Sequence, residues 1–420
     1  MYSLRHQATA LWLAMALLPS VAAAAPVVEV AVERLEPAHL AVVINERDPY
    51  SVAVGNAYVA AWGIPADNVI RVRFPVQVNM TAKAYNRVSK AVFAANPERV
   101  QGYALAWTEP FKVGCMSVTS AFTFGFDEAY CAKGCRATQA SRYFDADTRR
   151  PFDDLALRPA MNLAAASVAD ARRLIDRGQR AQHAWPGGTG YLVHTADQRR
   201  NVRARGFAAI AERWRGVADV RIVGESSMAG VENILFYFTG TPRVRGLDRN
   251  GFVAGAMADH LTSAGGRLTS DKQMSVLRWL EAGASGSYGT VVEPCNITAK
   301  FPDPGIAIER YLRGESLLEA YWKSVQMPGQ GVFVGDPLVA PFGGARVEAT
   351  GDGHRLVSHE LPEGEYRVAA ARRGERFEEV GTVSAMGTRA RHLALGETAY
   401  DCYRVAPAAA GGPALEGRCR

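Results

Sequence analysis

Polar side chains that could carry out chemistry gather in one short part of the chain. His260 has a side-chain pKa suited to proton transfer near neutral pH, and Asp259 or Glu293 could orient its ring. Ser263 could act as a nucleophile if His260 reached it, and Cys295 could act through its thiolate. This set predicts acid–base or nucleophilic chemistry of the kind that a hydrolase performs.

Each of these residues also has a structural explanation. A histidine beside a strand end often hydrogen-bonds a loop and fixes its shape, and an exported cysteine is usually half of a disulfide. If the site exists, a second group of polar residues is expected to contact its substrate. These residues are Thr262, Ser285, Tyr288 and Thr239.

Two segments with the sequence pattern of β-strands carry these side chains. The first starts at Phe252 and the second at Gly283, and a short amphipathic helix from Met274 to Leu280 connects them. A right-handed crossover places such strands side by side, and open α/β sheets bind ligands at the carboxyl edge of their strands. We therefore expect five residues to converge at that edge: Asp259, His260, Ser263, Tyr288 and Glu293.

The same alternation of apolar runs and amphipathic helices extends through most of the chain. Leu40–Ile44, Val69–Phe74 and Val100–Trp107 are apolar runs of strand length with helical patterns between them. The pattern predicts an α/β domain over residues 25–342, with a largely parallel sheet flanked by helices. Ile234–Phe238 is the most apolar run, so we expect it to be the central strand.

Two parts of the chain break this alternation. Residues 111–185 contain three cysteines and little periodicity, which predicts a disulfide-pinned insertion that covers the sheet edge as a lid or serves as a structural patch. Residues 343–406 contain short runs separated by glycine turns, which predict a small all-β sandwich module. The tail, residues 407–420, is rich in Pro, Ala and Gly and is expected to be loose.

The first residues have the layout of an export signal. Arg5 and His6 precede the apolar run Ala8–Leu18, and small residues follow, so we expect residues 1–24 to be removed. The mature protein is then periplasmic or secreted. An oxidising compartment favours disulfides for an even number of cysteines.

Six cysteines are present, and Cys402 and Cys419 stand apart from the others, so we expect them to pair. The other four allow three pairings, which the sequence leaves open. They are Cys115, Cys131, Cys135 and Cys295. No zinc-ligand spacing is found among them, and we expect no metal or cofactor.

The charge distribution argues against nucleic acid as a partner. The net charge is +6, but no block of Lys or Arg is present, and no later stretch is apolar for long enough to span a membrane. Glu46 and Asp48 end the first strand and could be metal ligands, although two acids in a turn are usually solvated. Glu109 and Arg245 also lie at strand ends, and their roles stay open.

Several motifs carry a resemblance to a known family. They are Asp259-His-Leu-Thr-Ser-x-Gly-Gly266, Gly283-Ala-x-Gly-Ser-Tyr-Gly289 with Glu293-Pro294, and Gly314-x-Ser-Leu-x-Glu-Ala320. With these motifs the chain resembles a family of exported bacterial proteins that has no assigned function. The match covers most of residues 38–342.

The layout is also similar, more remotely, to the gingipain-type, caspase-like cysteine peptidases. A Ser-Leu-x-Glu-Ala helix, a Gly-Asp-Pro strand end and a β-sandwich after the α/β domain carry this resemblance. In those enzymes a His-Gly follows one central strand and a nucleophilic Cys follows the next. Here Thr239-Gly240-Thr241 and Ala256–Ser263 occupy these places, without the histidine and without the cysteine. The resemblance implies a caspase-like sheet but not the activity.

Three functional hypotheses follow. The first is an exported protein that uses a caspase-like scaffold to bind an unknown protein or peptide ligand. The second is a hydrolase that uses His260 with Cys295 or Ser263. The third is a surface-assembly module whose β-sandwich docks a partner. The state of Cys295 separates the first two, because a disulfide would leave no thiol to act as nucleophile.

Overall fold

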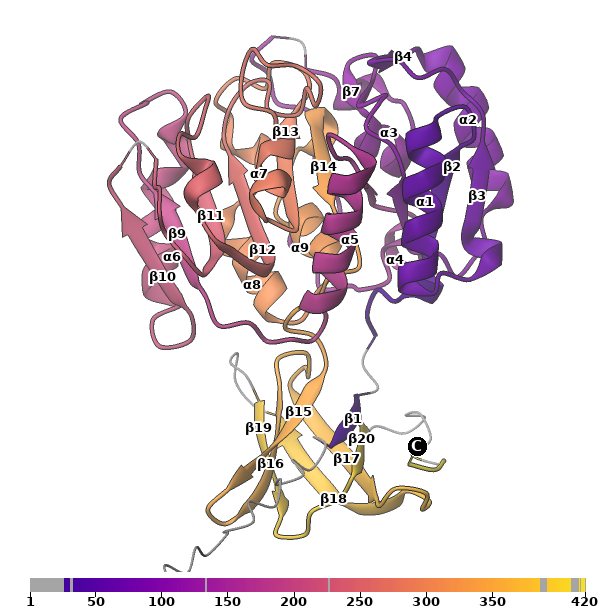
Figure 1. Cartoon of the computed structure of the whole chain (residues 1–420), viewed down its shortest axis with the longest axis vertical. Helices are drawn as coiled ribbons and strands as arrows, with labels where there is room; N and C mark the ends of the chain where they lie inside the picture. The colour runs from indigo at the N-terminus through magenta and orange to yellow at the C-terminus, as the bar shows by residue number, and fades with distance from the viewer. Residues whose placement is uncertain are drawn as a thin grey trace, which may run out of the picture.

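The computed structural model describes most of the chain. The described residues are 26–30, 33–132, 134–225, 227–385, 391–408, 415 and 417–419. The expected signal peptide and much of the expected loose tail lie outside these residues. Figure 1 shows a larger α/β part joined to a smaller all-β part.

A ten-stranded sheet forms the centre of the larger part (Figure 1). Its order is β10 (Asp219–Val223), β9 (Thr189–Val193), β11 (Ile234–Thr239), β12 (Phe252–His260), β13 (Gly286–Thr290), β14 (Gly331–Gly335), β8 (Ala160–Asn162), β5 (Gly102–Leu105), β2 (Leu40–Asn45) and β3 (Val69–Val72). All neighbours are parallel except the antiparallel pair β13–β14. The expected largely parallel sheet is confirmed.

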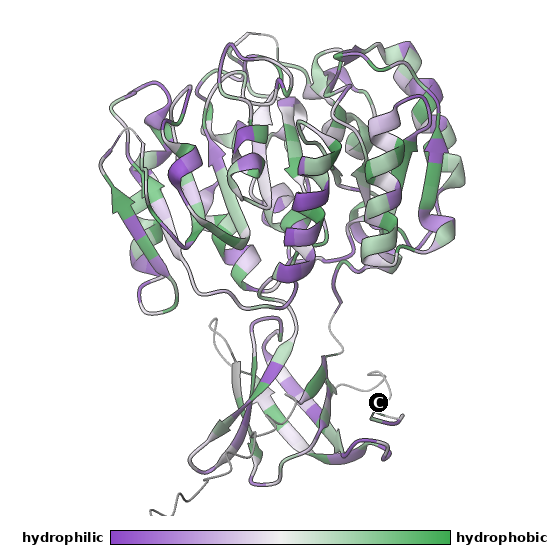
Figure 2. Cartoon of the chain, viewed as in Figure 1, coloured by the Kyte–Doolittle hydropathy of each residue, from purple (hydrophilic) through white to green (hydrophobic). Residues whose placement is uncertain are grey.

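Helices cover the sheet and bury two apolar clusters. They are α1 (Pro49–Trp62), α2 (Ala82–Ala95), α3 (Val118–Phe124), α4 (Pro151–Leu155), α5 (Val168–Ala181), α6 (Phe207–Arg213), α7 (Leu277–Ala282), α8 (Pro304–Leu312) and α9 (Leu317–Lys323). Helices α2, α3 and α7 pack into one cluster and α1, α6, α8 and α9 into the other, while α5 contributes to both. In Figure 2 apolar residues follow the strands, whereas α5 presents hydrophilic residues outward.

The prediction that Ile234–Phe238 is the central strand is wrong. These residues lie in β11, which is buried along its whole length but is only the third strand from one edge. A continuous apolar run reports that both faces of a strand are covered, and it does not report the strand's place in the sheet. The middle positions belong to β13 and β14.

Part of the expected insertion belongs to the main sheet. Within residues 111–185, Ala160–Asn162 form β8 between β14 and β5, and Val168–Ala181 form α5. The part before β8 contains α3 and α4, and its strands β6 (Lys112–Val113) and β7 (Met116–Ser117) form a small sheet with β4 (Asn79–Met80). A three-residue strand is too short to give a periodic signal in the sequence.

The all-β part is a sandwich of two sheets. One contains β1 (Val27–Val30), β20 (Cys402–Pro407), β17 (Gly364–Ala371) and β18 (Glu378–Ala385), and the other contains β15 (Ala345–Thr350), β16 (Gly353–Ser358) and β19 (Arg391–Gly396). Apolar residues from both sheets, including Leu356 and Tyr366, form one buried cluster. The expected sandwich is confirmed, but it also uses the N-terminal strand β1, which pairs parallel with β20.

All six cysteines form disulfides. Cys402 pairs with Cys419 as expected, and the open pairings resolve as Cys115–Cys131 and Cys135–Cys295. Disulfides are typical of proteins from oxidising compartments. No described helix is long and apolar enough to cross a membrane.

Candidate functional site

His260 ends strand β12 and is buried, with 1% of its surface exposed. Its Nδ1 accepts a hydrogen bond from the Trp279 indole N–H at 2.9 Å, and its Nε2 lies 3.0 Å from the Met274 carbonyl oxygen. Because an indole only donates and a carbonyl only accepts, the ring carries its proton on Nε2. Burial lowers the pKa of His260 to about 4, so the ring is neutral at neutral pH.

Asp259 does not orient His260, because neighbouring residues of a strand face opposite sides of the sheet. Its carboxylate forms a buried ion pair with Arg203, with an Oδ1–Nη2 distance of 2.5 Å and an Oδ2–Nη1 distance of 3.1 Å. Arg203 also donates to the carbonyl oxygens of Thr239 and Pro302. Burial raises the pKa of Asp259, while Arg203 opposes the rise. The pair joins β11, β12 and the segment before α8.

Three of the expected substrate-binding residues lie in the interior. The Thr239 hydroxyl donates to the Val193 carbonyl oxygen at 3.3 Å, and the Tyr288 hydroxyl donates to the Lys300 carbonyl oxygen at 2.6 Å. The Ser285 hydroxyl accepts from a backbone N–H at 3.0 Å. All three side chains are buried and line none of the cavities at the carboxyl edge. These hydrogen bonds stabilise the sheet.

The other four expected site residues do come together. Thr262, Ser263, Glu293 and Cys295 line a cavity of about 540 Å³ where β12 and β13 end. We call this cavity the Arg199 pocket. Its remaining lining residues are Cys135, Arg199, Arg200, Leu261 and Asn296. The disulfide between Cys135 and Cys295 joins the part of the chain before β8 to this edge, as the insertion was expected to do.

Cys295 cannot serve as the nucleophile that the hydrolase hypothesis requires. The disulfide with Cys135 leaves no thiol there, so the prediction that Cys295 could act as a nucleophile is contradicted. Both ring nitrogens of His260 are occupied by Trp279 and Met274, and no hydrogen bond joins His260 to Ser263 in the described part of the chain. Neither expected nucleophile–base pair is therefore formed.

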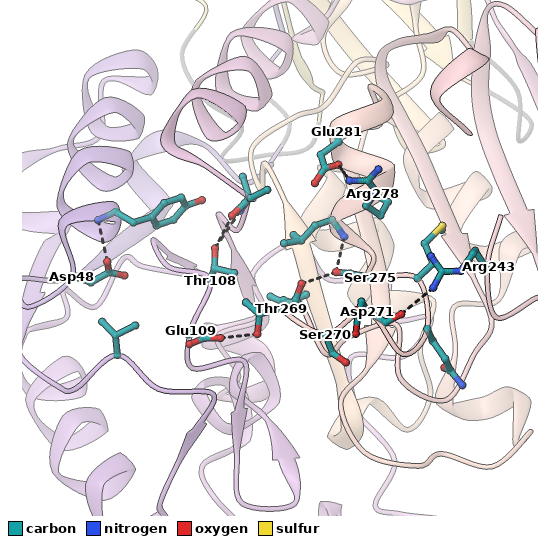
Figure 3. Close-up of a pocket in the computed structure, with 18 residues that line it drawn as sticks. Asp48, Thr108, Glu109, Arg243, Thr269, Ser270, Asp271, Ser275, Arg278 and Glu281 are labelled. Carbon is teal, nitrogen blue, oxygen red and sulfur yellow. Dashed lines mark hydrogen bonds and ion pairs between the residues drawn. The ribbon is translucent and has the colours of Figure 1, made fainter. Parts of the chain in front are cut away.

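A larger cavity, of about 740 Å³, opens at the same edge above other strands. Asp48, Thr108 and Ala165 follow the ends of β2, β5 and β8, and the opposite wall is formed by ten of the residues between Leu268 and Glu281 together with Arg243. Figure 3 shows the two walls facing each other. We call this cavity the switch-point pocket, because the chain leaves β2 for β3 on one side and then returns to β5 on the other. Open α/β sheets bind ligands at such a reversal of strand order.

The wall formed by the first strands is acidic. Asp48 is 8% exposed and caps α1, with its Oδ1 accepting from the Tyr50 N–H at 3.0 Å. Glu109 accepts a hydrogen bond from the Thr269 hydroxyl at 2.6 Å. Burial raises the pKa of Asp48, and the negative charge of Glu109 raises it further. No described Lys, Arg or His forms an ion pair with either carboxylate.

The opposite wall combines apolar side chains with charged ones. Arg243 donates to the Asp271 carbonyl oxygen at 2.9 Å, and Arg278 forms an ion pair with Glu281 at 2.5 Å (Figure 3). Leu268, Met274 and Leu277 are the apolar side chains of this wall, and Val76, which follows β3, adds another to the first wall. The pocket therefore has an acidic end whose two carboxylates form no ion pair with a described residue, and a second wall of apolar side chains and two arginines.

The sequence alone left the roles of Asp48 and Glu109 open and indicated no role for residues 268–271. Both acids follow apolar strands, and that signal was visible in the sequence. Their convergence depends on β5 lying beside β2, which the sequence does not state. Among the described residues, no group of three or more His, Cys, Asp or Glu side chains could hold a metal ion.

Comparisons with known proteins add little to this geometry. No protein-family model matches the chain, and no curated protein matches it significantly. One solved structure, described as "Structure of Protease", has a TM-score of 0.44 and 11% sequence identity. The alignment covers 88% of this chain and 94% of that chain. The likeness is weak.

Proposed function

We propose that this protein is an exported binding protein whose switch-point pocket takes a cationic group on an aliphatic stem. A lysine or arginine side chain of a peptide has this chemistry. The observation that carries the proposal is Asp48, a buried carboxylate without a cationic partner that faces a cavity of about 740 Å³. The three disulfides support export.

The electrostatics of the pocket favour a cation. Burying a carboxylate is costly unless an opposite charge compensates it, and a second carboxylate nearby adds repulsion. Burial raises the pKa of Asp48, and the negative charge of Glu109, which lines the same cavity, adds to the rise. An ammonium or guanidinium group from a ligand would offset one of the two negative charges and so weaken the repulsion between the carboxylates. It would also supply the hydrogen-bond donors that the free carboxylate oxygens lack.

The shape and polarity of the walls fit an aliphatic stem. Val76 is 48% exposed although it lines the cavity, and Leu268 and Leu277 lie on the other wall. Lysine and arginine bury their methylene stems against apolar surface while the charged head contacts polar groups. The volume lies within the range of pockets that hold small molecules or peptide side chains.

A thiol peptidase is not supported by the same structure. The six cysteines are paired in disulfides, and the neutral ring of His260 is held by two interior partners. Incubation of the protein with mixed peptides, followed by mass spectrometry, is expected to show no cleavage. Cleavage that disappears in a Ser263→Ala variant would restore the hydrolase hypothesis.

Calorimetric titration with two matched peptides tests the binding proposal. Acetyl-Gly-Lys-Gly-amide carries the charge, and the same peptide with norleucine retains the stem without the charge. We expect the lysine peptide to bind at least about tenfold more tightly, which corresponds to about 1.4 kcal/mol. The variant Asp48→Asn should lose this preference, because an amide has no charge but still caps the helix.

Asp303→Asn is the matched control, because Asp303 caps α8 in the same way and lies outside the switch-point pocket. It should keep the preference for lysine. Equal affinity for both peptides, or an unchanged preference in Asp48→Asn, would refute the proposal.

A further inference from the structure

The Arg199 pocket and the switch-point pocket share one loop, residues 261–276. Thr262 lines the first pocket and donates to Gln273 Oε1 at 2.8 Å, and Gln273 lines the second pocket. Gly266 holds this loop on β13 through a hydrogen bond from its N–H to the Thr290 carbonyl oxygen at 3.0 Å. A Cβ on Gly266 would lie 2.3 Å from the Gly289 carbonyl oxygen, so only glycine permits this approach.

The two pockets have opposite electrostatic character. Arg200 is partly compensated, since its Nη1 lies 2.8 Å from Asp197 Oδ2 and its Nε donates to the Thr262 hydroxyl at 3.2 Å. Glu293 is the carboxylate of the Arg199 pocket, and its Oε1 accepts from the Cys295 N–H at 2.8 Å. The buried ammonium of Lys300 interacts electrostatically with Glu293. Arg199 is exposed, and its guanidinium forms no ion pair with a described residue.

Unused hydrogen-bond donors point to the same conclusion. The guanidinium of Arg199 has no hydrogen bond or ion pair to another described residue, and only its backbone N–H contacts Asp197. The Nη2 of Arg200 and the hydroxyl of Ser263 are also without a described partner. A guanidinium presents its N–H groups in a planar fork that matches carboxylate and phosphate oxygens.

We propose that the Arg199 pocket is a second ligand site, which binds an oxyanionic group such as a carboxylate or a phosphate. Arg199 supplies the charge, and Arg200 and Ser263 supply further donors from the same cavity. The disulfide Cys135–Cys295 forms part of its wall and fixes the part of the chain before β8 against it. This site does not depend on cation binding in the switch-point pocket.

Two small probes test the site separately. Glutarate represents a carboxylate and inorganic phosphate represents the alternative, and each is titrated into the whole protein by calorimetry at constant low ionic strength. We expect one or both to bind the wild-type protein, and Arg199→Gln to weaken that binding at least about fivefold, as expected for a lost charged hydrogen bond. The probe that binds more tightly identifies the class of oxyanion.

Arg205→Gln is the matched control, because Arg205 lies in the 3-10 helix Asn201–Gly206 that follows Arg199 and is exposed, but does not line the Arg199 pocket. It should bind the probes as the wild type does, and so should Asp48→Asn. Absence of binding by both probes, or equal weakening by Arg199→Gln and Arg205→Gln, would overturn the second site. Neither result would bear on the preference for lysine peptides in the other pocket.

Discussion

At the scale of single residues, buried titratable groups link this fold to pH. His260 has its pKa lowered to about 4 by burial, below its ordinary value of 6.5. Above pH 6.5 the ring is neutral in both the folded and unfolded states. As the pH falls from 6.5 toward 4, the unfolded state binds a proton that the folded state does not, so stability falls.

We therefore predict that the free energy of unfolding decreases between pH 6.5 and pH 4, and that His260→Gln removes part of this decrease. Each unit of pKa difference corresponds to about 1.4 kcal/mol. Urea unfolding of both proteins across this range measures the effect. Parallel curves for the two proteins would show that His260 does not titrate as its burial implies.

Asp336 gives stability the opposite dependence on pH. Its carboxylate follows β14, accepts from the Tyr58 hydroxyl at 2.7 Å and from the Trp62 indole N–H at 3.1 Å, and burial raises its pKa to about 7. The folded state keeps a proton that the unfolded state releases above its ordinary pKa of 3.8, so this contribution to stability is lost as the pH rises from 3.8 to 7.

Asp336→Asn should remove this pH-dependent loss, although the amide also imposes a constant cost because it cannot accept from both partners. Thermal unfolding at pH 5 and pH 7 tests it: the melting temperature of the wild type relative to the variant should be lower at pH 7. A constant difference at both pH values would contradict the assignment.

The place of the polar residues at a strand end was predictable from the sequence, but the environment of each side chain in the fold was not. The polar cluster at 259–263 was located correctly at the end of a strand. Whether His260 faced a cleft depended on Trp279, and the partner of Asp259 is Arg203, which lies 56 residues earlier. Such contacts between distant residues are set by packing, and one sequence does not display them.

At the scale of elements, the long alternation of apolar runs and helices predicted the sheet, whereas two short strands were not predicted. β8 has three residues, too few for a periodic signal, and the four-residue β1 was also not predicted. The Cys135–Cys295 disulfide closes 160 residues of sequence and ties two distant elements together, whereas Cys402–Cys419 closes only 17.

A longer closed loop restricts the unfolded chain more. In the chain-entropy treatment, the longer disulfide contributes about 5 kcal/mol and the shorter about 3 kcal/mol. We predict that replacing Cys135 and Cys295 by serine lowers the free energy of unfolding more than replacing Cys402 and Cys419. Denaturant unfolding of the two double variants compares them, and a larger loss from the C-terminal pair would contradict this prediction.

At the scale of the whole molecule, the sequence indicated the order of the two parts but not how they connect. Strand β1 crosses from the N-terminal side to pair with β20, and Arg34 contacts the buried Glu360 at 3.1 Å. Deleting residues 343–420 to test partner docking by the sandwich would therefore also leave β1 without its neighbour. That hypothesis stays a prediction, and its test requires removal of β1 as well.

The switch-point pocket is likewise a property of the whole fold. Asp48 and Glu109 approach each other only because β2 and β5 are neighbours, and the apolar wall comes from a loop more than 150 residues later. The sequence showed acids at strand ends but not the strand order that joins them. For this reason the predicted site was placed at β12 and β13, and the larger cavity was not predicted.

A structure of the complex with acetyl-Gly-Lys-Gly-amide tests the central claim most directly. The account predicts that the lysine ammonium lies in the switch-point pocket, within about 3 Å of the Asp48 carboxylate, as in a charged hydrogen bond. Its stem should lie against Val76 and Leu268. A peptide bound elsewhere, or a lysine side chain that points to solvent while Asp48 remains without a partner, would contradict it.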